Sequence, residues 1–225
     1  MLFRSATCLR DQLRQVARSG DGVAGLGLSL HGPVDAERGV LLFSEHLGWQ
    51  EVPFRDDLER LLGMPVAAEA ETRAVALAEQ CWGAARGAQD FVLMEMDSGI
   101  GMTQVLGGRL CRGRHSLAGE LGFTAWETGP GTLPRRPRVL EQIASLRALC
   151  EQAARLAGAR DRETAKPGRE RLPEAEWLAW LNEAARAGDP RACRLLDDAA
   201  RALGLAVANV LNLLDHELVL LTGGM

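Results

Sequence analysis

A hairpin pattern punctuated by glycines, between Phe91 and Leu106, constrains most strongly what this chain can fold into. Phe91–Met96 is an apolar run of strand length, and Ile100–Leu106 alternates its side chains between two faces, as a strand does. Asp97-Ser98-Gly99 separates the two runs, and Gly107-Gly108 follows where a two-residue hairpin requires positive φ angles. The segment therefore predicts a strand, a turn, a second strand and a tight turn.

A single carboxylate among glycines comes next, in Gly119-Glu120-Leu121-Gly122. Glycine has no Cβ and lets the backbone approach a small ligand closely. These residues alone leave two interpretations open, a ligand-binding glutamate or a structural loop with a surface glutamate.

Strand-length apolar runs alternate with helical patterns along the chain, which predicts an α/β fold. Asp189-Pro190 is an N-cap followed by proline at the first helical position. Strands are expected over residues 23–30, 39–43, 65–68 and 217–221, and helices over 4–18, 54–62, 71–81, 140–158, 174–187 and 190–214. Residues 159–173 are expected to form a charged connector.

Bulk composition excludes some classes of protein. With 225 residues and 47% hydrophobic content, the chain can bury a core of one or two domains. Its formal net charge of −4 gives no general electrostatic reason to bind nucleic acid. The five cysteines are odd in number and form no CxxC pair, and no signal peptide or membrane-length apolar run is evident. A reduced, cytoplasmic location without membrane attachment is therefore expected.

A set of motifs in fixed order carries a family resemblance. The set is Gly32-Pro33-Val34-Asp35, residues 65–79, Trp82–Gly87, the Gly119–Gly122 segment and Leu140-Glu141. In this order the motifs resemble the ROK family of sugar kinases and sugar-responsive repressors. The resemblance extends over nearly the whole chain and is closest to the repressor branch, which includes the N-acetylglucosamine repressor.

The resemblance implies an α/β fold of the two-lobed, actin-like (ribonuclease-H-like) sugar kinase type. Residues 1–87 would form part of the N-terminal lobe, and residues 88–225 the second lobe with a helical part. The fold is expected to be incomplete at the N-terminus and at the C-terminus.

The resemblance also places a degenerate catalytic base. Where the kinases have Glu-Asn-Asp, this chain has Glu69-Ala70-Glu71. Ala70 removes an amide that contacts the sugar, and Glu71 carries its carboxylate one methylene further out, which lowers the rate of a positioned reaction. Glu71 is therefore either a sugar contact or a carboxylate at a helix N-terminus, where the dipole favours it.

The remaining sugar contacts follow by the same carry-over. Glu120 matches the family glutamate that accepts hydrogen bonds from sugar hydroxyls, and Glu141 matches a second one, unless it is a helix N-terminal glutamate. Gly32 of the Gly-Pro motif also belongs to the expected sugar site. His115 lies near the expected pocket, with a solvated loop histidine as the alternative, whereas His31 is interpreted as a turn residue.

Cofactor sites of the family are degraded in this sequence. Phe123 replaces the zinc-binding histidine, and Thr132–Val139 offers neither thiolate nor imidazole, so no metal is expected. The phosphate loop reads Asp97–Thr103, with Met102 where the backbone approaches phosphate and an acidic Asp97 that repels it. No nucleotide cofactor is expected either.

We therefore expect a non-catalytic sugar-sensing effector domain of a ROK-type transcriptional regulator, not an enzyme. Its partner would be a small sugar or sugar phosphate, with self-association into a homo-oligomer. DNA would be contacted only through a helix-turn-helix that this chain does not show. The alternatives are an ATP-dependent ROK kinase for a hexose or amino sugar, and an oligomerising remnant without ligand.

Overall fold

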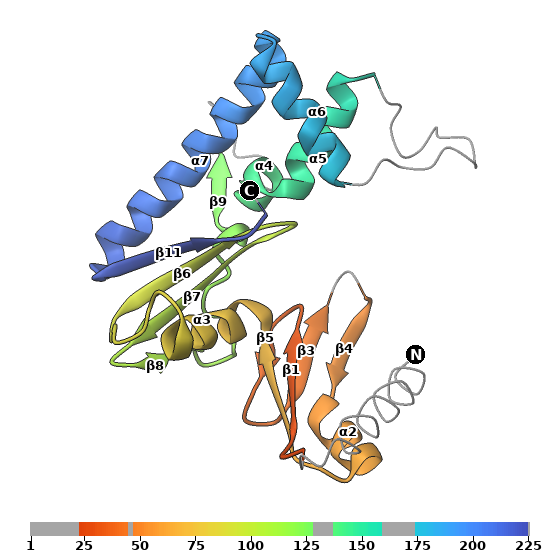
Figure 1. Ribbon diagram of the computed structural model, residues 1–225, viewed down its shortest axis with the longest axis vertical. Helices are drawn as coiled ribbons and strands as arrows, with labels where there is room; N and C mark the ends of the chain where they lie inside the picture. Colours follow the sequence, from red (N-terminus) through yellow and green to blue (C-terminus); the bar gives the residue numbers. More distant parts are fainter. Residues whose placement is uncertain (1–22, 45–46, 128–136, 159–173, 225) are drawn as a thin grey trace, which may run out of the picture. The chain divides into compact units, whose positions relative to one another are not determined.

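A computed structural model describes residues 23–44, 47–127, 137–158 and 174–224 of the chain (Figure 1). The chain divides into two compact units. The first comprises residues 1–83 with 112–118, and the second comprises residues 84–111 with 119–225. The helix expected over residues 4–18 and the connector over 159–173 lie outside the described residues.

The first unit combines a parallel strand pair, an antiparallel sheet and two helices among its described residues. β1 (Leu26–Leu30) pairs in parallel with β5 (Val66–Ala70). The other elements are β2 (Val34–Asp35), β3 (Val40–Ser44), β4 (Trp49–Val52), α2 (Phe54–Leu62) and α3 (Glu71–Trp82). Buried side chains of Val34, Leu41, Phe54, Leu58, Val66 and Ala68 form its core.

The second unit is built on a sheet with the strand order β11-β6-β7-β8. The strands of this sheet are β6 (Phe91–Met96), β7 (Ile100–Leu106), β8 (Arg109–Leu110) and β11 (Leu218–Thr222). β6 and β7 pair as the predicted antiparallel hairpin, and β11 joins β6 in parallel. Gly107 and Gly108 have the expected positive φ angles of 55° and 74°.

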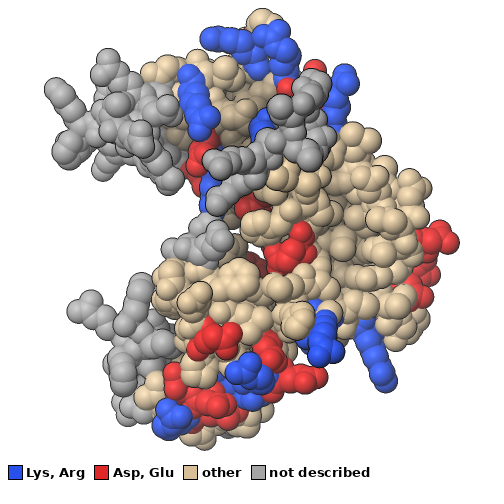
Figure 2. All heavy atoms as spheres, turned by 180° about the vertical axis from the view of Figure 1, so that it is seen from behind, with Lys and Arg blue, Asp and Glu red and all other residues tan. Residues whose placement is uncertain are grey.

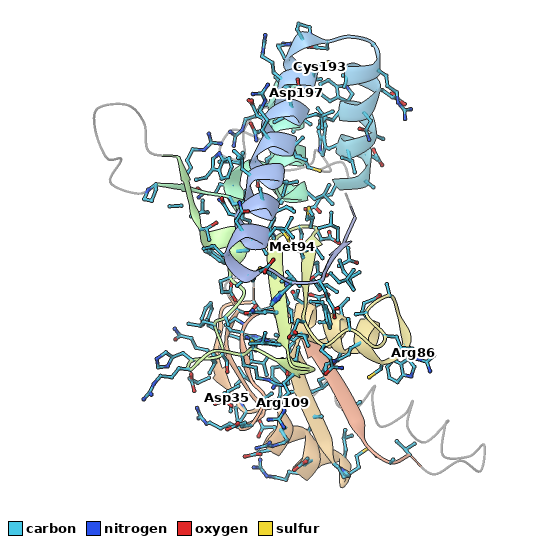
Figure 3. The ribbon with its side chains drawn as sticks, turned by 90° about the vertical axis from the view of Figure 1, so that its left-hand side faces the viewer. Asp35, Arg86, Met94, Arg109, Cys193 and Asp197 are labelled. Carbon is cyan, nitrogen blue, oxygen red and sulfur yellow. The ribbon has the colours of Figure 1, made fainter. Side chains whose placement is uncertain are left out.

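Helix α7 (Pro190–Leu214) packs along this sheet (Figure 1). Val92 and Met94 of β6 are buried with Val210 of α7, and Figure 3 shows Met94 beneath the helix. The helix confirms the expectation for residues 190–214. Asp189 caps its first turn by accepting the Arg191 N–H at 2.8 Å. The hydrogen bond from the Arg191 side chain lowers the pKa of Asp189 to about 2, so the cap is charged at neutral pH.

The helix predicted over residues 140–158 is in fact two helices. α4 (Glu141–Ala144) ends at Ser145, and α5 (Leu146–Leu156) begins there. The buried Ser145 hydroxyl accepts the Ala148 N–H at 3.1 Å, which makes Ser145 an N-cap and starts a new helix. Helix α5 packs with α6 (Glu174–Arg186) and α7 around the fully buried Leu181.

Short strands were not anticipated from the sequence. β9 (Ala125–Glu127) and β10 (Arg138–Val139) pair as a short antiparallel ladder. A 3₁₀ turn, η1, covers Leu121–Phe123.

Charged side chains of the first unit lie interspersed on the face seen in Figure 2. Within this unit, salt bridges join Asp57 to Arg60 and Asp35 to Arg38. No helix among the described residues is long and apolar enough to cross a membrane.

Candidate functional site

The carboxyl ends of β1 and β5 bring two titratable side chains together. The parallel register pairs Leu30 with Ala70, so the next residues along each strand, His31 and Glu71, emerge side by side. His31 Nδ1 lies 3.4 Å from Glu71 Oε2, and each side chain is 51% exposed. A carboxylate that opens helix α3 and an imidazole beside it form an accessible pair able to accept and donate hydrogen bonds.

Gly32, the next residue after His31, has a structural reason to be glycine. Its φ is +119°, and a Cβ there would collide with the carbonyl oxygen of Phe43 on β3. Asp35 of the same motif accepts the Arg38 N–H at 3.0 Å and closes a turn (Figure 3). The motif thus lies close to β3 at Gly32 and forms a turn at Asp35. The sugar-binding role of Gly32 stays a prediction.

A nearly buried ion network lies just behind the His31–Glu71 pair along α3. The Glu69 side chain is 12% exposed, and its Oε2 accepts hydrogen bonds from Arg112 Nε at 3.0 Å and Nη2 at 2.6 Å. Arg73, with a side chain 5% exposed, approaches Glu69 Oε1 at 3.5 Å and donates to the Ser116 carbonyl at 2.8 Å. The network therefore joins the start of α3 to residues 112–118.

His115 lies exposed on this 112–118 segment. The expected sugar residues of the first unit are thus Gly32, Glu71 and His115, while Glu120 and Glu141 belong to the second unit.

The Gly119–Gly122 segment lies directly on strand β7. Met102 N–H donates to the Gly119 carbonyl at 2.9 Å, and a Cβ at Gly119 would collide with the Met102 carbonyl. A Cβ at Gly122 would lie 2.5 Å from the Ile100 carbonyl oxygen. Close approach to β7 therefore gives both positions a structural reason to be glycine. Glu120 itself is exposed between them.

Glu141 is engaged with the protein backbone. At the start of α4, its Oε2 accepts the Ile100 N–H at 3.1 Å. The same oxygen lies 3.0 Å from the Cβ position of Gly99 and 2.9 Å from that of Gly122. Glu141 therefore ties the β6–β7 turn to the Gly119–Gly122 segment, and its role as a sugar contact stays a prediction.

The β6–β7 turn is where the family resemblance places the phosphate loop. Two of its backbone amides donate hydrogen bonds to the protein's own carboxylates. Asp97 Oδ1 accepts the Ser98 N–H at 2.7 Å, and Glu141 accepts the Ile100 N–H. A phosphate cradle needs backbone N–H groups directed at the anion. Here a phosphate at these two amides would have to displace two carboxylates that repel it.

No group of three or more metal-ligating side chains occurs in the described part of the chain. Phe123 is 55% exposed and offers no ligand atom. Residues 128–136 of the zinc region lie outside the described residues.

We expect purified protein to contain no stoichiometric zinc, because a structural site needs four thiolate or imidazole ligands and this region of the sequence supplies none. Elemental analysis measures this after the protein is incubated with zinc and then dialysed against zinc-free buffer. Zinc that survives dialysis, and is lost when residues between Phe123 and Val139 are replaced, would contradict the expectation.

The chain matches the model of the ROK family over residues 7–225. It belongs to the ROK family. It is 26% identical over 217 residues to the xylose repressor of Caldicellulosiruptor bescii, which covers 95% of this chain and 53% of the repressor.

Two solved structures are also similar to this ROK protein. The ROK hexokinase from Thermus thermophilus has a TM-score of 0.76 and 32% identity, covering 98% of this chain and 70% of the hexokinase chain. A ROK transcriptional regulator homologous to the Escherichia coli MLC protein has a TM-score of 0.78 and 29% identity. The match covers 98% of this chain and 55% of the regulator chain. The actin-like sugar kinase fold is therefore confirmed, and the chain spans about half the length of the regulators.

Repressors and sugar kinases both occur among these relatives. Family membership is therefore compatible with a regulator and with a sugar kinase. The residues of the candidate site are the basis for choosing between the two functions.

Sequence reasoning missed several residues of the site. His31 was interpreted as a turn residue, although its place after a strand parallel to β5 was a usable signal. Arg73 and Arg112 carried no local signal, because the contacts from Glu69 to Arg112 and from Arg73 to Ser116 join residues 43 positions apart.

Proposed function

We propose that this ROK protein is a non-catalytic sugar-sensing effector domain of a transcriptional regulator. The observation that supports it best is the β6–β7 turn, where Asp97 and Glu141 take the amides that a nucleotide phosphate would need. A domain that binds a sugar without ATP can still report the sugar, because a ligand shifts the population of any conformation that binds it better.

The proposed ligand is a hexose, an amino sugar or a phosphate ester of one. Glu120 is the proposed main acceptor for its hydroxyls, with Glu71, Glu141, Gly32 and His115 as further contacts. The names of the relatives support a carbohydrate, since they include a xylose repressor and a hexokinase. N-acetylglucosamine as the particular sugar, self-association and a cytoplasmic location stay predictions.

An ATP-dependent sugar kinase is the second candidate, and one observation favours it. Glu71 stands at the position of the family base, with His31 at 3.4 Å to orient it. The length of the side chain argues against a kinase, because a base must reach the hydroxyl whose proton it abstracts. Glutamate is longer than the family aspartate and shifts the carboxylate by about 1 Å, enough to cost on the order of a hundredfold in rate.

We expect no sugar phosphorylation above about one turnover per second, because the phosphate turn is occupied and Ala70 lacks the family amide. A coupled assay with hexoses and amino sugars, in the presence of ATP and magnesium, measures this turnover. Thermal-shift measurements with sugar alone and with ATP-magnesium alone show which of the two ligands binds. Stabilisation by sugar and none by ATP-magnesium is the expected result. Turnover that disappears in Glu71→Gln would establish the kinase instead.

We expect His31→Ala to weaken sugar binding by about threefold to tenfold, the contribution of one neutral hydrogen bond. His31→Gln keeps a donor and an acceptor and should lose less. Calorimetry of both variants beside the parent chain tests this. Equal affinities for all three would remove His31 from the site.

A further inference from the structure

Residues 112–118 form a compact loop of the first unit. The Ala118 N–H donates to the Arg112 carbonyl at 3.2 Å, which closes the loop. Arg114, His115 and Leu117 are exposed on it. Ser116 has a φ of +56°, a left-handed conformation that costs a non-glycine residue energy and persists only where neighbours enforce it.

Arg73 contacts the loop at Ser116. Its Nη2 reaches the Ser116 carbonyl at 2.8 Å and the Ala118 carbonyl at 3.4 Å, and its Nη1 lies 3.4 Å from the Val34 carbonyl on β2. A guanidinium has five donors in a rigid fork, so one side chain can fix several carbonyls at once. Arg73 therefore joins β2, α3 and the loop.

Glu69 completes the arrangement from the other side. Its Oε1 accepts the Ala70 N–H at 3.0 Å and faces Arg73, while its Oε2 holds Arg112 at the entrance of the loop. A carboxylate with 12% exposure holds two arginines, and charge-assisted bonds of this kind are stronger than neutral ones. The loop is thus held at its first residue by Glu69 and at Ser116 and Ala118 by Arg73.

We propose that Glu69, Arg73 and Arg112 form a clamp of positioning residues that holds loop 112–118, and with it His115, in the conformation used for the ligand. This rests on the proposed sugar-binding function for its ligand part. The clamp residues act through the loop and are not themselves proposed to contact the sugar. Ligand affinity would then depend on residues that do not themselves contact the ligand, two of which, Glu69 and Arg73, are nearly buried.

Hydrogen exchange of the full 225-residue chain without sugar tests the clamp by itself. We expect Arg112→Met to raise the exchange of the 112–118 amides by about tenfold or more, since a bond to a charged group is lost. Arg73→Met should do the same. Arg112 is 39% exposed, so its variant remains informative if Arg73→Met does not fold.

Arg60→Met is the matched control, because Arg60 pairs with Asp57 at 3.2 Å on α2 of the same unit with 74% of its side chain exposed. It should leave loop exchange unchanged. Glu69→Gln combined with Arg112→Met should raise exchange no further than either change alone, as expected for residues of one network.

Calorimetry with the sugar that the parent chain binds tests the ligand part. We expect Arg112→Met to weaken binding by about tenfold and Arg60→Met to leave it unchanged. Unchanged loop exchange in both clamp variants would overturn the clamp. Faster exchange with unchanged sugar affinity would overturn its role in positioning. A parent chain that binds no sugar would refute the proposed function, while the exchange experiment would still decide whether the clamp exists.

Discussion

Replacing Glu120 by alanine should weaken sugar binding by about tenfold to a hundredfold, because a charged acceptor contributes about 1.5–3 kcal/mol through its hydrogen bonds to a hydroxyl. Glu120 is exposed between two glycines that hold the segment on β7, so the backbone should remain in place. Thermal stability should therefore change little. Calorimetry gives the affinity, and far-ultraviolet circular dichroism gives the stability.

Two control variants sharpen this result. Glu183→Ala removes an exposed carboxylate from α6 in the same unit and should leave sugar binding unchanged. Glu120→Gln keeps the shape and one acceptor oxygen and should lose less than Glu120→Ala. If the parent chain binds no sugar, or binds it equally well after Glu120→Ala, the sensor proposal fails and an association module becomes the better description.

Replacing Gly119 by alanine should have the largest effect on the second unit. The φ of Gly119 is +99°, and its new Cβ would collide with the Met102 carbonyl. Backbone strain together with displacement of packed segments should cost about 2–5 kcal/mol. Glu120 would move with the backbone, so sugar binding should be lost as well. Urea unfolding followed by circular dichroism measures the stability.

Gly107→Ala isolates the collision from the backbone strain. Gly107 also has a positive φ, 55°, but nothing lies within 4 Å of its Cβ position. The loss of folding stability in this variant should therefore come only from the left-handed backbone conformation, at about 1–2 kcal/mol. Similar losses for the two variants would show that the contact with Met102 has no energetic importance.

Regular elements with strong periodicity were predictable from the sequence. Phe91–Met96, Ile100–Leu106 and Phe54–Leu62 have the predicted bounds, because apolar runs, alternation and a closing glycine are local signals. The break at Ser145 was not predicted, since the apolar pattern continues across it and only the capping hydroxyl marks it. β9 and β10 are too short to show a pattern.

The candidate site was predictable only where it lies in motifs. Glu71 and Glu120 are proposed from their sequence neighbours, whereas the partner of Glu71, His31, comes from a segment 40 residues away. Arg112 meets Glu69 through tertiary packing, which leaves no local signal. Glycines in motifs were also ambiguous. Gly32 and Gly119 closely approach neighbouring strands, and a glycine pattern alone does not distinguish close approach to a strand from close approach to a ligand.

On the proposed function, the β6–β7 turn sets how many substitutions a phosphate site would need, because two carboxylates hold two of its amides. Freeing the Ser98 amide by Asp97→Thr leaves Glu141 on the Ile100 amide, and replacing Glu141 alone leaves Asp97 on the Ser98 amide. Neither single substitution frees both amides. On the proposed function, a triphosphate site at this turn would therefore need at least two substitutions at once.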